Sequence, residues 1–292
     1  MESKLKPYIL LAPVAIILIS IMGFGIANCV MQSLGYMPYI GAENISFRFY
    51  KEVIRDSVFL ESLIFSLKTS FISSTVAVFI GVILAYFLSQ EKLSKIKESL
   101  LNLPVIIPHI VVVMLMITIF SQSGIISRIL YSLNIISDSS QFMSLVSDKN
   151  GVGVILVYLW KGIPFTIITA YNILKNISNN LEKVAINLGA SKLQCFRYII
   201  LPLASPTIIS SFIILFAFSF GSFEVPFLIG PTTPKALSVS AYTSYISSDL
   251  SQRSYAMVIN VILSSLSFIL LIVYNKILEK INRYKIYEEI LK

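Results

Sequence analysis

Four ionisable side chains lie within strongly apolar stretches of this sequence: Lys68, His109, Lys161 and Glu224. An ionisable group inside a membrane is costly and therefore raises a functional question. For His109, the chain's single histidine, we expect an interhelical hydrogen bond, with a place on a polar pathway as the alternative. For Lys68 and Lys161 we favour snorkelling towards a nearby interface. Glu224 either faces a cationic ligand or, as we favour, pairs with a lysine or caps an irregular turn.

The sequence contains no pattern for metal or nucleotide chemistry. No phosphate loop of the form G-x-x-x-x-G-K-[ST] occurs, and Gly230–Lys235 and Gly189–Lys192 lack its spacing. No group of Cys, His and carboxylates has metal-ligand spacing. Cys29 and Cys195 lie in segments of different character, which predicts no disulfide framework. We therefore expect no catalytic residues, no metal and no cofactor, although lipid chemistry that uses scattered Asp and Glu stays open as an alternative.

Composition identifies an integral membrane protein. Hydrophobic residues make up 56% of the chain and charged residues 13%, and the mean hydropathy is +0.82. A soluble domain needs a far larger charged fraction. The net charge of +8 then reflects basic cytoplasmic loops rather than affinity for nucleic acid. Six apolar segments are long enough to span a bilayer: 8–31, 63–88, 101–120, 151–174, 207–229 and 257–277.

Charge asymmetry predicts the orientation of these spans. Lys and Arg are in excess at the N-terminus, in the 89–99 link, in the 175–200 segment and in the C-terminal tail. The positive-inside rule places these regions, and so both termini, in the cytoplasm. Prolines 104, 108, 164 and 226 predict kinks in spans three to five, which makes this core the expected site of a translocation route. The predicted fold is all-α: one polytopic transmembrane helix bundle over residues 1–292.

The polar segment 175–206, between spans four and five, has two helix signals. Asn179 and Glu182 have the spacing of a helix start, and Gly189 is placed to close that helix in a left-handed conformation. The apolar stripe on this helix consists of Leu181, Val184, Ala185 and Leu188. Ser191 and Gln194 form a second capping box.

The second helix has its own apolar face, formed by Leu193, Phe196 and Ile200, and Pro202 is expected to kink or end it. The first helix, roughly eight residues and about 12 Å long, is too short to be stable alone or to span a bilayer. Two interpretations stay open: it rests on the membrane surface or its own domain, or it docks in a groove of a cytoplasmic partner.

The same segment resembles the EAA loop of membrane subunits of binding-protein-dependent ABC importers. Glu182-Lys183-Val184-Ala185 stands at E-E-A-A, followed by Gly189-Ala190-Ser191 and by Ile199-Ile200-Leu201-Pro202. Lys183 replaces the second acid of that pattern and Val184 its first alanine. The six spans, the position of the loop and the segment 160–165 are also similar to type I (MetI-like) importer permeases. The segment 221–227 resembles the branch for polyamines, iron and related substrates.

This resemblance implies a non-catalytic permease subunit in a prokaryotic cell membrane. It implies docking of a cytoplasmic ATPase, in two copies, at Leu181, Glu182, Lys183, Val184, Ala185, Leu188, Gly189, Ala190 and Ser191. It implies a second permease chain, a different chain being favoured over a copy, and an extracytoplasmic binding protein. Candidate residues of the translocation path are His109 and Glu224.

A polyamine is the first substrate that the resemblance implies, followed by ferric iron, organophosphonates and sugars. An ion-gradient-driven secondary transporter is the rival class, although no convincing internal repeat supports it. A membrane enzyme is the second rival, and the missing catalytic constellation disfavours it.

Overall fold

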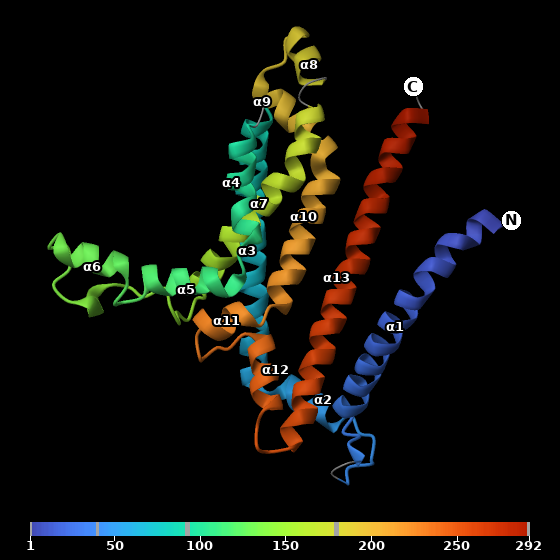
Figure 1. Ribbon diagram of the computed structural model, residues 1–292, viewed down its shortest axis with the longest axis vertical. Coiled ribbons are helices and arrows are strands. Elements are labelled where there is room, and N and C mark those ends of the chain that lie inside the picture. The colour runs from blue at the N-terminus through green and yellow to red at the C-terminus, as the bar shows by residue number, and fades with distance from the viewer. Residues whose placement is uncertain (1, 39–40, 91–93, 178–180, 291–292) are drawn as a thin grey trace. The chain divides into compact units, whose positions relative to one another are not determined.

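The computed structural model describes residues 2–38, 41–90, 94–177 and 181–290, and over these residues the regular structure is helical (Figure 1). The elements are α1 (Glu2–Ser33), α2 (Arg48–Arg55), α3 (Ser57–Ser89), α4 (Lys95–Ile106), α5 (His109–Phe120), α6 (Ile125–Ser132), the 3₁₀ turn η2 (Ser139–Gln141), α7 (Val152–Ile177), α8 (Lys183–Asn187), α9 (Lys192–Cys195), the π-helical turn η4 (Phe196–Ile200), α10 (Leu201–Gly221), α11 (Glu224–Ile229), α12 (Leu237–Tyr245) and α13 (Ser251–Ile290).

Six helical stretches within the described residues are long and apolar enough to cross a membrane. About 20 apolar residues are needed for this. The stretches are Leu10–Ser33, Ser57–Ser89, His109–Ser132, Val152–Ile177, Lys192–Gly221 and Ser251–Ile277. The all-α fold class and the six predicted spans are confirmed, although the third and fifth spans have different bounds.

The predicted third span, 101–120, is wrong as a single helix. α4 ends at Ile106 and α5 begins at His109. Ile107 between them is extended (ψ 129°) because the ring of the following proline disfavours the helical region. Pro108 also has no N–H with which to continue the helix. In Figure 1, α5 and α6 run across the direction of α4 and α7.

The predicted fifth span, 207–229, begins earlier and ends earlier than expected. Its helix is continuous from Lys192 and stops at Gly221. Ser222 is extended (ψ 134°), and the short helix α11 starts afresh at Glu224. Gly and Ser are weak helix formers, so the helix ends at these two residues although the apolar composition continues beyond them.

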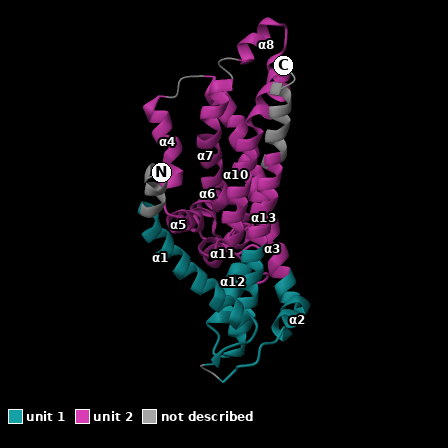
Figure 2. Ribbon diagram, turned by 90° about the vertical axis from the view of Figure 1, so that its right-hand side faces the viewer, with its two compact units in different colours: residues 1–60, 237–265 teal, residues 61–236, 266–292 magenta. Residues whose placement is uncertain are grey.

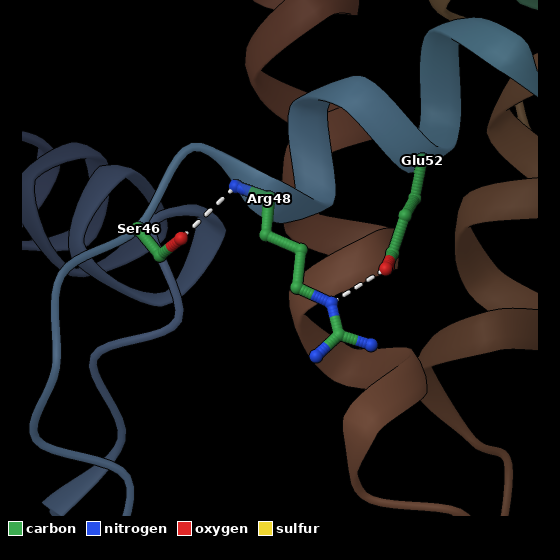
Figure 3. A network of polar contacts seen from close by, with 3 residues as sticks. All are labelled: Ser46, Arg48 and Glu52. Carbon is green, nitrogen blue, oxygen red and sulfur yellow. Dashed lines mark hydrogen bonds and ion pairs between the residues drawn. The ribbon is translucent and has the colours of Figure 1, made fainter.

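The chain forms two compact units (Figure 2). The first comprises residues 1–60 and 237–265. In this unit the Tyr255 hydroxyl donates to the Asp56 carboxylate, which links α13 to the start of α3. Figure 3 shows the start of α2, where Arg48 N–H donates to Ser46 Oγ and Arg48 Nε lies 2.6 Å from Glu52 Oε1. Both charged side chains are exposed, so this ion pair contributes little stability.

In the second unit, residues 61–236 and 266–292, α3 and α7 approach each other closely at two glycines. A Cβ added at Gly81 would lie 2.5 Å from the Thr166 Cβ, and one at Gly162 would lie 2.9 Å from the Ala77 Cβ. Small residues at such positions let helices approach closely, which is how membrane helices gain packing energy. The loop described below contacts α3, and the cavity described below is lined in part by α7.

Two apolar clusters complete the core of this unit. One lies near the 181–200 loop and joins α3, α7, η4 and α10 through Ala85, Ile167, Ala170, Leu174, Ile200 and Ala204. The other joins α5, α7 and α11 through Val112, Val113, Val154, Val157, Tyr158, Val225 and Ile229. The broken elements α5 and α11 are thus packed against protein, which is where interrupted backbone is tolerated at membrane depth.

Candidate functional site

The loop between α7 and α10 ends its first helix as the glycine spacing predicts. Gly189 has φ +93°, its N–H donates to Ile186 O at 2.9 Å, and Ala190 N–H donates to Ala185 O at 3.0 Å. These are the two bonds of a Schellman motif, which satisfies carbonyls left free at a helix end. The left-handed conformation predicted for Gly189 is confirmed. The expected helix cap at Asn179 lies outside the described residues.

The helix itself is shorter than the predicted eight residues. α8 covers Lys183–Asn187, Leu181 and Glu182 have π-helical hydrogen bonding, and Leu188 already lies in the closing turn. A helix this short has little intrinsic stability. Its position is therefore set by its caps and by the contacts of its side chains.

The second capping box is confirmed. Ser191 Oγ accepts from Gln194 N–H at 3.3 Å, and Gln194 Oε1 accepts from Ser191 N–H at 2.8 Å. The helix does not end at Pro202, which corrects one of the two outcomes expected there. Leu201 N–H bonds to Phe196 O across the π-helical turn, and the helix continues through Pro202 into α10.

The side chains around α8 separate into an outward and an inward set. Leu181, Val184 and Leu188 are exposed by 44%, 55% and 84%, and we call these three residues the α8 apolar surface. Lys183 and Ser191 are also exposed, and Ala190 is half-buried. Ala185, which the sequence places on the same stripe, is buried and packs inward with Glu182.

Glu182 anchors the loop to α3. It is only 3% exposed, and its two carboxylate oxygens accept hydrogen bonds from Tyr86 Oη and Gln90 Nε2, both at 2.9 Å. The Tyr86 ring also packs 4.8 Å from the Phe196 ring, between ring centroids. Sequence reasoning placed Glu182 among residues that touch a partner, whereas its carboxylate faces its own protein.

A cavity of about 220 Å³ lies between α4, α5, α7 and α10. Its walls are mainly apolar and aromatic, and its polar side chains are His109, Tyr158, Lys161 and Ser219. Lys161 Nζ donates to Ile107 O at 2.8 Å and lies 3.5 Å from His109 Nδ1. Ile107 O is left free by the end of α4, so the lysine replaces a helical donor there.

Of the other candidate residues, His109 also lies at the cavity, whereas Glu224 and Lys68 do not line it. His109 lines the cavity and its ring stacks on Phe218, with 5.0 Å between centroids. Glu224 is exposed in the first turn of α11 and is not part of the cavity wall, although it is an electrostatic neighbour of His109. Lys68 is exposed on α3. Lys161, for which snorkelling was favoured, instead lines the cavity, and α7 continues through Gly162 and Pro164 without a break.

Known proteins are similar to this chain over most of its length. The Helicosporidium protein described as a probable sulfate transport system permease, cysT, is 25% identical over 236 residues, which cover 80% of this chain and 83% of that protein. The molybdate/tungstate permease WtpB of Pyrococcus abyssi is 28% identical over 205 residues, 69% of this chain and 73% of that one. The maltose/maltodextrin permease MalF of Salmonella typhimurium is 32% identical over 218 residues, 69% of this chain but 41% of MalF.

Among solved structures, a bacterial ABC transporter that imports the acidic polysaccharide alginate has the same fold. The TM-score is 0.77 at 18% identity, and 96% of each chain is covered. Residues 77–283 match the family described as the binding-protein-dependent transport system inner membrane component. The chain therefore belongs to this family of membrane permease subunits of ABC importers.

Proposed function

We propose that this subunit forms a translocation path and couples it to a cytoplasmic ATPase through the α8 apolar surface. As a family member it is a non-catalytic, multi-pass permease of the inner membrane, and ATP hydrolysis belongs to a separate subunit. Because the chain belongs to this family, we set aside the two rival classes, the ion-gradient-driven transporter and the membrane enzyme.

The observation that carries the proposal is an exposed apolar surface on a firmly held short helix. Fully burying a Val or Leu side chain is worth about 1.5–3 kcal/mol. Because Leu188, Val184 and Leu181 are exposed, much of this free energy of burial would be gained only on docking. The Schellman motif and the Glu182 anchor hold these side chains in place before binding, which lowers the entropy lost on docking. Helix-in-groove docking fits this arrangement.

The other partners follow from relatives. The similar alginate transporter was also solved with an alginate-bound periplasmic protein, which supports an extracytoplasmic binding protein here. We propose two ATPase subunits and a second, different permease chain. Contact of Lys183, Gly189, Ala190 and Ser191 with the ATPase belongs to the same proposal. For Ala185 and Glu182, whose side chains are buried, we propose a supporting role beneath the surface.

We place the path at the cavity between α4, α5, α7 and α10. His109 lines it, and Glu224 is proposed at its approach from α11. A polyamine was implied by the likeness of segment 221–227 alone. The relatives named above transport sulfate, molybdate or tungstate, and maltodextrins according to their descriptions. The substrate class that the cavity chemistry favours is argued in the next subsection.

Co-purification from membranes tests the docking proposal. The chain and its ATPase are co-expressed, solubilised and captured through a tag on the chain. Leu188→Asp is expected to remove the ATPase from the eluate, because it places a charge where an apolar side chain is to be buried. Asn187→Asp, at the adjacent exposed position, is the control and should retain it. Equal ATPase recovery with both variants would refute docking at this surface.

A further inference from the structure

The wall of the cavity described above has a positive character. Lys161 and His109 supply its basic side chains, and no carboxylate is among its lining residues. Over the described part of the chain, no Asp or Glu lies within ion-pair distance of Lys161. The ion pair among the described residues joins Arg48 and Glu52, at the start of α2. A lysine within a membrane span is costly unless it meets an opposite charge or water.

Lys161 has donor capacity directed to the cavity. An ammonium group has three N–H donors. One bonds to Ile107 O at 2.8 Å and a second faces His109 Nδ1 at 3.5 Å. These contacts hold the side chain inside the protein rather than at a membrane interface. The third donor is available to a ligand in the cavity that Lys161 lines.

His109 can add a second donor. A neutral imidazole that turns Nδ1 towards an ammonium carries its proton on Nε2. The ring is held by its stacking on Phe218. The Tyr158 hydroxyl and Ser219 complete the polar part of the wall, and the Tyr158 hydroxyl already donates to Ser219 O at 3.3 Å. Lys161 and His109 therefore supply the N–H donors that remain available at this wall, one of them charged, whereas Tyr158 Oη remains as an acceptor.

We propose that this cavity is a transit site for a small oxyanion of the sulfate or molybdate type, held by Lys161 and His109. Ammonium and imidazole N–H groups form charge-assisted hydrogen bonds with such oxygens. Small-molecule sites commonly measure about 300 to 1,000 Å³, so a cavity of about 220 Å³ suits a ligand of few atoms. A polyamine would meet an ammonium group and no carboxylate among the residues that line the cavity. This inference rests on the proposed function, because it concerns the same path.

Trp160 provides a native probe for this site. It is the chain's only tryptophan, and it precedes Lys161 on α7. The full chain in lipid nanodiscs is titrated with sodium sulfate, sodium molybdate and spermidine at constant ionic strength, while Trp160 fluorescence is followed. We expect a saturable change with at least one oxyanion and none with spermidine. Saturation by spermidine alone, or by none of the three, overturns the proposal.

Variants separate ligand binding from support of α4. Lys161→Met is expected to weaken oxyanion binding at least about tenfold, as loss of a charge-assisted bond implies. Lys161→Arg keeps the charge and should retain most of the affinity. Lys68→Met removes an exposed lysine of another span and should change nothing. Unchanged affinity in Lys161→Met refutes the role of Lys161, and if that variant does not fold, the wild-type titration alone decides. Failure of the wild-type chain to co-purify with its ATPase would instead count against the docking proposal and would leave the oxyanion site standing.

Discussion

Removing the Tyr86 hydroxyl should loosen the loop that carries the α8 apolar surface. Tyr86→Phe deletes the 2.9 Å hydrogen bond to Glu182 and keeps the ring that packs on Phe196. A hydrogen bond to a charged group contributes about 1.5–3 kcal/mol. Tyr86 is half-buried, and solvent screening reduces this to about 1–2 kcal/mol. Because Glu182 is 3% exposed, water does not replace the lost donor unless the loop moves.

Hydrogen exchange of the loop amides measures this loss. Gly189 and Ala190 donate the Schellman bonds, so their amides exchange when the loop opens. A loss of about 1–2 kcal/mol corresponds to exchange roughly 5- to 30-fold faster. Tyr198→Phe is the matched control, because Tyr198 is 68% exposed in the same region and should leave exchange unchanged.

Two results would refute this account of the anchor. Equal exchange in Tyr86→Phe and the wild type would show that the carboxylate contact does not hold the loop. Additive effects of Tyr86→Phe and Glu182→Gln would show that the two residues act independently, whereas partners in one hydrogen bond give a coupling energy of about 0.5–3 kcal/mol. If the anchor is right, the double variant should be little worse than Glu182→Gln alone.

Two further changes test the backbone and the helix packing. Gly189→Val should cost about 1–2 kcal/mol, because φ +93° is strained for a residue with a Cβ even though space is open there; it should lower transport per ATP hydrolysed, and normal coupling would contradict this geometry. Gly81→Leu should lower the thermal unfolding temperature of the solubilised chain, because its Cβ would meet an α7 side chain at 2.5 Å, and overpacking costs about 1–3 kcal/mol. Gly221→Leu, where a Cβ meets nothing within 4 Å, is the control for Gly81, and equal melting of the two variants would disprove close α3–α7 contact.

Features that depend on neighbouring residues were predictable from the sequence. The spans follow from runs of apolar residues, and the left-handed Gly189 and the Ser191 capping box follow from spacings of a few residues. The inward direction of Glu182 was not predictable in this way, because its partner Tyr86 lies 96 residues earlier in the chain. The position of Glu182 in the EAA-type pattern suggested contact with another protein instead.

The interrupted helices show the same limit. Hydropathy continues through Pro108 and through Ser222, so it predicted single spans where the backbone becomes extended. The proline signals were visible, but kinking and breaking a helix leave similar traces in a sequence. The role of Lys161 was hidden for a related reason. Its acceptor, Ile107 O, becomes free only because α4 ends there, 54 residues away.

The loop contacts both α3 and α10, and this affects how it would transmit force. Glu182 fastens one end to the final turn of α3, and the π-helical turn passes the other end into α10 without a break. A load applied at α8 would therefore be divided between α3 and α10 instead of swinging the loop about a single hinge. α10 is also a wall of the cavity, so a load that passes from α8 into α10 would reach that wall directly. Docking at α8 would thus be felt at the cavity through α10, while the contact of Glu182 with α3 limits how far the loop can move.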